Sequence, residues 1–393
     1  MRMYSILLVI IYVAFISLGL PDSLLGAGWP VMHVEIGAPI SYAGIITMLI
    51  SVFTIISSLI STKLTVKIGS GLFTAISVAL TALAMIGFSF ANSFWILVVL
   101  TVPYGLGAGG VDATLNNFVA LHYKSRHMSW LHCFWGVGAM ISPYIMGYSI
   151  GTSAGWHGGY RIVGLIQAVL AVALFISLPL WKKVDVKVEQ TEEVKSESLT
   201  LKQIFSIKGV FVWLIGFFCY CALEQTMMLW SGTYFAQYKL IDSDKAAFYS
   251  SFVFIGITAG RFVSGFVAEK LGDKRLIRIG YSVILAGLVL VAIPVKNVIP
   301  SVAGFTVAGI GCAPVYPSII HATPDNFGKE KSQAIIGVQM AFAYTGITLM
   351  PPLFGLIAQY VNVGFLPLYV FIFTVLLIVC CEIYYAKKAK NVY

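Results

Sequence analysis

The feature that most constrains this chain is a succession of apolar stretches, each about as long as a bilayer is thick. A helix needs about 20 apolar residues to cross the hydrocarbon core, and charged residues make up only 10% of the 393 positions. Soluble domains carry about 25% charged residues. The sequence therefore predicts an all-α integral membrane protein with twelve transmembrane helices. We expect these spans at roughly residues 4–27, 39–61, 71–91, 94–119, 129–150, 160–181, 209–232, 246–268, 276–294, 298–320, 332–359 and 363–385.

The distribution of basic residues predicts how the spans are oriented. With the N-terminus in the cytoplasm, 20 of the 25 Lys and Arg residues fall in cytoplasmic segments and four fall in outer segments. Positive charge is enriched in cytoplasmic loops of membrane proteins, so both termini are predicted to be cytoplasmic and the protein to lie in the plasma membrane. The basic residues are scattered among short loops rather than gathered on one face, which argues against a nucleic-acid partner.

A long polar segment divides the chain in two. Residues 182–208 carry six lysines and five acidic residues, a composition typical of a solvated linker. We expect an N-terminal six-helix bundle at residues 1–181 and a C-terminal six-helix bundle at 209–393. The halves also repeat a pattern of helix-breaking residues 208 positions apart: Gly138, Pro143 and Gly147, then Gly346, Pro351 and Gly355. This indicates two parallel repeats, which in transporters hold the substrate between them near the membrane midplane.

An acidic residue stands inside the fourth predicted span. Four glycines in the segment from Tyr104 to Asn117 are expected to thin one side of the helix, and Asp112 follows them with Asn116 one turn later. An intramembrane carboxylate costs about 2.5–3.5 kcal/mol at a helix centre, so it normally faces a cavity or a partner. Two interpretations stay open: a packing aspartate satisfied by Asn116 and a neighbouring helix, or a protonatable site in a transport protein.

Two further acids have similar alternatives. Asp22 lies toward the outer end of the first predicted span, where it is either an interfacial cap or the outer member of an acid pair with Asp112. Glu224 lies near the middle of the seventh span and is followed by Gln225, and a carboxylate beside an amide suits the recognition of hydroxyl groups. The alternative for Glu224 is a structural ion pair with Arg261.

The stretch G-R-F-V-S-G-F-V-A-E-K-L-G-D-K-R resembles the loop signature of the major facilitator superfamily. In that superfamily the signature joins the second and third helices of a half. The resemblance implies two rocking six-helix bundles and a gating motif formed by Gly260, Arg261, Gly265, Lys274 and Arg275.

Three further pieces resemble the fucose:proton symporter family and related glucose/mannose permeases. They are L-P-D-S-L-L, G-A-G-G-V-D-A-T-L-N-N-F and W-L-H-C-F-W-G-V-G-A. The resemblance implies proton coupling by Asp22 and Asp112, and a sugar site that includes Asn116, His132 and Trp135. Glu224 and Gln225 are expected to contact the sugar on the ground of their own chemistry. His132 and Trp135 stand where the fucose symporter has amides, and a histidine there is also a common packing residue.

The sequence as a whole favours a secondary active transporter that imports a small polyhydroxylated solute, expected to be a monosaccharide, by proton symport. Sodium stays open as the coupling ion. The alternatives are a drug or metabolite:proton antiporter of the same fold and a non-transporting membrane sensor. No G-x-S-x-G, P-loop or H-E-x-x-H motif is present. We therefore expect no enzyme activity, no cofactor and no metal, and a monomer in the lipid bilayer.

Overall fold

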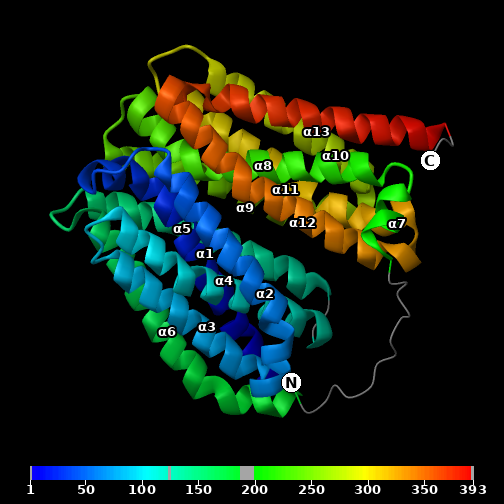
Figure 1. Ribbon diagram of the computed structural model, residues 1–393, viewed down its shortest axis with the longest axis horizontal. Helices are drawn as coiled ribbons and strands as arrows, with labels where there is room; N and C mark the ends of the chain where they lie inside the picture. The colour runs from blue at the N-terminus through cyan, green and yellow to red at the C-terminus, as the bar shows by residue number, and fades with distance from the viewer. Residues whose placement is uncertain (1, 123–124, 186–198, 391–393) are drawn as a thin grey trace. The chain divides into compact units, whose positions relative to one another are not determined.

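The chain folds almost entirely into α-helices joined by short turns (Figure 1). The computed structural model describes residues 2–122, 125–185 and 199–390, and these contain twelve helices of 19 or more residues and no strand. Helices are the expected structure because the bilayer core offers no water to an unpaired backbone group. The predicted all-α class and the number of long helices are confirmed.

Most of these helices are apolar enough to cross a membrane. Ten segments of the described residues meet the length and hydropathy that a span requires, and one of them, Ala334–Ala389, contains two helices. Ser125–Ile150 is the long helix outside this set. Its first half contains His127 and His132.

The described chain forms two compact units. The first is Met1–Thr191 with Gly232–Phe254, and the second is Glu192–Ser231 with Ile255–Tyr393. The long helices of residues 1–191 are α1 (Arg2–Glu35), α2 (Tyr42–Ile68), α3 (Ser70–Phe88), α4 (Phe94–His122), α5 (Ser125–Ile150) and α6 (Gly155–Asp185). The remaining helices are α7 (Leu201–Ser206), α8 (Val210–Thr233), α9 (Ser243–Leu271), α10 (Asp273–Ala292), α11 (Ile299–Phe327), α12 (Lys329–Ile357) and α13 (Leu366–Ala389). A π-helical turn, Tyr234–Tyr238, continues α8.

The largest difference from the predicted spans concerns α1. The prediction ended this helix at residue 27, but it continues through Pro21 and Pro30 to Glu35. Proline is tolerated in membrane helices because neighbouring groups satisfy the freed backbone. Asp22 consequently lies near the middle of the apolar segment Ile6–Glu35 rather than at its end. The interpretation of Asp22 as an interfacial cap is therefore wrong.

Glycines let α4 pass between two other helices of the first unit. A Cβ atom at Gly105 or Gly109 would collide with the backbone of α2, and one at Gly107 or Gly110 would collide with Ser77 of α3. The expectation that these glycines thin one side of α4 is wrong, since they serve two faces. Small residues at such crossings allow the close backbone approach that drives helix association in lipid. The result is a fixed position for the polar residues that α4 carries.

The repeat that the sequence predicted recurs as the same contact in each half of the sequence. In the first unit a Cβ at Gly138 of α5 would strike the carbonyl oxygen of Ile16 in α1. In the second unit a Cβ at Gly346 of α12 would lie 2.7 Å from the carbonyl oxygen of Phe218 in α8. Glycines 208 positions apart therefore seat equivalent helices against each other.

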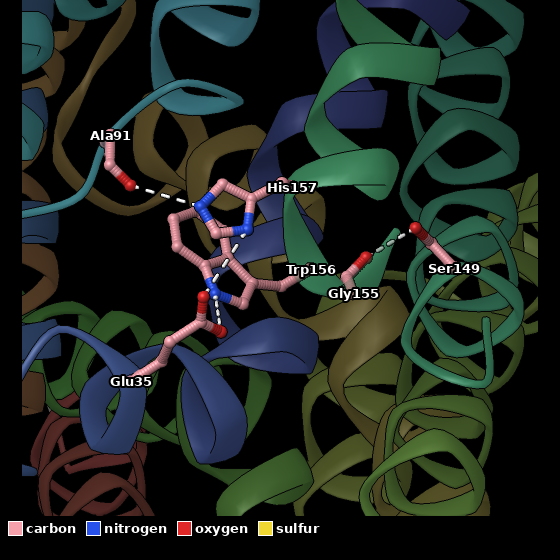
Figure 2. A network of polar contacts seen from close by, with 6 residues as sticks. All are labelled: Glu35, Ala91, Ser149, Gly155, Trp156 and His157. Atoms are coloured by element: carbon pink, nitrogen blue, oxygen red, sulfur yellow. Dashed lines mark hydrogen bonds and ion pairs between the residues drawn. The ribbon is translucent and has the colours of Figure 1, made fainter. Parts of the chain in front are cut away.

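The end of α1 is held by polar contacts to the start of α6 (Figure 2). Trp156 is fully buried, and its indole N–H donates a 2.7 Å hydrogen bond to Glu35 Oε2. The ring of His157 stacks on Trp156, and its Nε2–H donates to the carbonyl oxygen of Ala91 at 3.2 Å. His157 Nδ1 faces the other Glu35 oxygen at 3.8 Å. Glu35 is thus the acceptor for a buried donor as well as a partner for the histidine.

Replacing Glu35 with alanine should destabilise the protein because it leaves the buried Trp156 N–H without its acceptor. An unsatisfied buried donor costs about 1–3 kcal/mol. We expect a lower thermal unfolding midpoint in detergent for Glu35→Ala. Glu35→Gln keeps a carbonyl oxygen in place and should retain most of the native midpoint. Equal midpoints for Glu35→Ala and the unaltered chain would contradict this role of the bond.

Candidate functional site

Asp22 is the centre of a hydrogen-bonded cluster in the first unit. Its Oδ2 accepts a 2.8 Å bond from the indole N–H of Trp135 in α5, and its Oδ1 accepts a 3.1 Å bond from the hydroxyl of Tyr104 in α4. Asp22 is exposed although positions 17–21 and 23–30 of the same helix are all buried. Three helices thus hold one carboxylate in a fixed place while leaving it accessible.

Asp112 lies on α4, two turns along the helix from Tyr104. Asn116 donates its amide N–H groups to Asp112 Oδ1 at 2.9 Å and to the Asp112 carbonyl oxygen at 3.0 Å. Both side chains are half-buried. The contact to Asn116 is the one that the packing interpretation of Asp112 expected, and a protonatable Asp112 stays a prediction.

Tyr104 is a site residue that the sequence reasoning missed. Tyr104 is buried and begins the glycine-rich segment. Its hydroxyl group contacts Asp22, and its ring packs edge-on against Phe88. A tyrosine inside an apolar span usually places its hydroxyl against a partner. The sequence therefore indicated that the Tyr104 hydroxyl needs a partner, but it did not identify that partner as Asp22 on another helix.

His132 lies on α5, one turn before Trp135. Its side chain is exposed, and its ring packs edge-on against Phe15 of α1 at a centroid distance of 5.9 Å. The structure therefore brings Asp22, Trp135 and His132 to the interface of α1 and α5.

Glu224 and Arg261 pair in the second unit, as the alternative interpretation of Glu224 expected. Glu224 lies in the middle of the apolar segment Val210–Tyr238, and Arg261 lies on α9. Arg261 Nη2 is 3.5 Å from Glu224 Oε1, and the two side chains are only 17% and 14% exposed. Glu224 Oε1 is buried and accepts no hydrogen bond from the described residues. The pair is therefore close enough for charge neutralisation but leaves an acceptor oxygen open.

The remaining predicted residues occupy different places. Gln225 is half-buried beside Glu224 on α8. Gly260, Arg261 and Gly265 lie within α9, and only Lys274 and Arg275 lie next to the turn, in the first turn of α10. The predicted span at residues 246–268 already contained the first three, and α9 continues to Leu271. The turn itself is Gly272, whose φ of +71° is unfavourable for residues with a side chain.

Two aromatic residues of α8 and its continuation belong to the core. Trp230 is fully buried and donates its N–H to the Pro351 carbonyl oxygen at 3.0 Å. Tyr234 is 1% exposed. Trp135, by contrast, is half-buried and donates its N–H to Asp22.

The chain is similar at low identity to several known proteins. The chain is 24% identical to Bypass of stop codon protein 6 of Saccharomyces cerevisiae over 70% of its own length. It is 24% identical to the glucose/mannose transporter GlcP of Bacillus subtilis over 62%. These alignments cover 61% and 60% of the two relatives, so the chain spans about three fifths of their length. It is also 24% identical to the class H tetracycline resistance protein of Pasteurella multocida, over 81% of this chain and 80% of that protein.

The fold has solved counterparts as well. A bacterial homologue of the human lysosomal transporter Spinster, solved in an inward-facing and unoccupied conformation, matches with a TM-score of 0.78. The identity is 11%, and the match covers 98% of this chain and 96% of that one. A family model described as the Major Facilitator Superfamily matches residues 11–295 and 235–391. Because this model covers nearly all of the sequence, the chain belongs to the Major Facilitator Superfamily of membrane transporters.

Proposed function

We propose that this transporter imports a small polyhydroxylated solute, a monosaccharide, together with protons. The protein lies in the plasma membrane with both termini in the cytoplasm. Bundles at residues 1–181 and 209–393 alternate access to a central site by rocking. Asp22 and Asp112 carry the proton, and Asn116, His132, Trp135, Glu224 and Gln225 contact the solute.

The observation that carries this proposal is the setting of Asp22. A carboxylate in mid-membrane is costly unless it faces water or a partner, and Asp22 is both exposed and hydrogen-bonded by Trp135 and Tyr104. An exposed acid at this depth suits a group that exchanges protons with an aqueous path. The indole that it holds offers an apolar face on which a sugar ring can stack.

The second unit supports the solute part of the proposal. Glu224 Oε1 is a buried acceptor without a hydrogen-bond donor among the described residues, and Arg261 lies 3.5 Å away. Buried acceptors normally have a donor. A hydroxyl group of the solute would supply one, and Gln225 would add a donor and an acceptor beside it.

The known relatives point in two directions. The similarity to a glucose/mannose transporter favours a sugar, and the similarity to a tetracycline resistance protein favours the alternative, proton-coupled export of a drug or metabolite. Efflux antiporters carry a glycine directly before the proline of the fifth span, whereas Ser142 precedes Pro143 here. We therefore place the sugar symporter first.

Uptake into vesicles tests the function. Purified protein in proteoliposomes should accumulate at least one member of a labelled monosaccharide panel when an inward proton gradient is imposed, and the external medium should become more alkaline. A sodium gradient of the same size, with no proton gradient, tests the other coupling ion. Accumulation driven by sodium alone, or proton-dependent dye extrusion without any sugar uptake, would overturn the proposal.

Asp112→Asn is expected to abolish accumulation while leaving solute exchange intact. Asparagine matches the size of aspartate and keeps an oxygen that can accept the hydrogen bond from Asn116. It cannot gain and lose a proton, so the accumulation ratio should fall to about one, because coupling and not binding has been removed. The measurement compares uphill uptake with counterflow of the labelled sugar in the same vesicles.

The matched control is the same substitution at an exposed loop acid, Asp242→Asn. Vesicles with this variant should accumulate solute normally, because Asp242 pairs at the surface with Lys245. If Asp112→Asn still concentrates solute under a proton gradient, Asp112 is a packing residue held by Asn116.

Glu224→Gln separates the solute role of Glu224 from its ion pair with Arg261. A hydrogen bond to a charged group contributes about 1.5–3 kcal/mol, so losing it should raise the solute Kd by about tenfold to a hundredfold. Uphill transport should remain measurable at high solute concentration.

The double variant Glu224→Gln, Arg261→Gln removes both charges of the pair. Breaking a buried pair by removing one partner is costly, and removing both relieves that cost. If the double variant regains native affinity together with native thermal stability, Glu224 acts only through Arg261. We expect stability to recover and affinity to stay low.

A further inference from the structure

The short helix α7 is built to hold a fixed shape. Thr200 caps its N-terminus: the Thr200 hydroxyl oxygen accepts from the Gln203 backbone N–H, and Gln203 Oε1 accepts from the Thr200 backbone N–H at 2.8 Å. This reciprocal capping box satisfies donors that six residues could not satisfy alone. Ile204 is buried with Val210, Leu214 and Ile335. The segment is thus docked against α8 and α12 (Figure 1).

The position of α7 follows from chain length. Its last residue, Ser206, precedes the membrane-spanning segment that begins at Val210 by four positions. Four residues span at most about 14 Å, and the headgroup layers add roughly 5–8 Å on each side of the hydrocarbon core. Ile204 also packs against Leu214, which lies inside the span. The helix therefore lies beside the end of this apolar segment, within reach of the headgroups.

One side of α7 carries apolar groups that the protein leaves uncovered. Leu201 and Phe205, one turn apart, are 62% and 42% exposed. Phe211, at the start of the adjoining span, is 55% exposed, and its ring lies 6.2 Å from that of Phe205. The uncovered surface is therefore continuous with a membrane helix.

Basic residues flank this apolar surface. Lys202 and Lys208 are both exposed, on α7 and just after it. A lysine close to an anionic membrane surface is attracted to it. Aromatic rings and basic side chains together are typical of segments that lie in the membrane interface.

We propose that α7 is an interfacial anchor whose Leu201 and Phe205 insert among the lipids while Lys202 and Lys208 bind anionic headgroups. The anchor would hold the N-terminal ends of α8 and α12, against which α7 packs, at the bilayer surface. It is independent of which solute is transported.

Spin-label accessibility in reconstituted full-length protein tests the anchor. A nitroxide is attached at Phe205→Cys, and its accessibility to oxygen, which partitions into lipid, is compared with its accessibility to a water-soluble nickel chelate. The matched control is Ser206→Cys, the next residue, whose side chain is exposed on another face of the same helix. The unaltered chain, labelled in parallel, gives the background from its six native cysteines.

The label at 205 should be severalfold more accessible to oxygen than to nickel, and the label at 206 should show the reverse. The difference should increase when vesicles of phosphatidylcholine alone are replaced by vesicles that contain phosphatidylglycerol. The double variant Lys202→Gln, Lys208→Gln, labelled at the same two positions, should not show that increase. Equal nickel accessibility at both positions would overturn the anchor, as would protection of residue 205 from both reagents, which would indicate a protein cover. Equal results in both lipids would overturn the role of the lysines.

Discussion

Close approach of helix backbones at glycine is the constraint on which the candidate site depends. Lipid offers no hydrophobic drive for helices to associate, so packing and interhelical polar contacts must hold them. Gly105 and Gly109 seat α4 against α2, while Gly107 and Gly110 seat it against α3. Tyr104 and Asp112 lie on the same stretch of α4, and their positions are set by those crossings. A bulkier residue at any of the four would displace the polar groups as well as the helix.

The buried charges follow a second constraint, the cost of an unpaired ion away from water. Each of the three acids within the apolar segments has a different kind of partner. Asp22 accepts bonds from two aromatic side chains, Asp112 accepts from the asparagine one turn later, and Glu224 faces an arginine on another helix. The hydrogen bonds described for Asp22 and Asp112 come from neutral groups, whereas Glu224 faces a positive charge. This difference is why we assign proton exchange to Asp22 and Asp112 and not to Glu224.

The repeated sequence pattern gains a physical meaning from these contacts. Gly138 and Gly346 were noticed only for their spacing, yet each meets a backbone carbonyl oxygen of the first long helix of its own half, at Ile16 and at Phe218. The superfamily signature also has a clear place in the structure. Its first glycines and Arg261 lie inside α9, as the span predicted at residues 246–268 implied, and Gly272, with a positive φ, ends that helix.

The sequence alone determined the membrane class and the number of long helices, because helix length and apolar composition are local properties set by the thickness of a bilayer. It named Asp22, Asp112 and Trp135 as site candidates but missed Tyr104. It also raised the pairing of Asp112 with Asn116, since a four-residue spacing brings side chains together on any helix. Only the tertiary structure decided that Trp135 and Tyr104 both bind Asp22, that Glu224 meets Arg261, and that α1 continues past Asp22 to Glu35. The first two are contacts between helices far apart in the sequence, and no local pattern encodes which side chains meet across a crossing. The length of α1 could not be predicted because the helix contains Pro21 and Pro30, and proline within a helix is tolerated only where the surrounding structure satisfies the freed backbone groups.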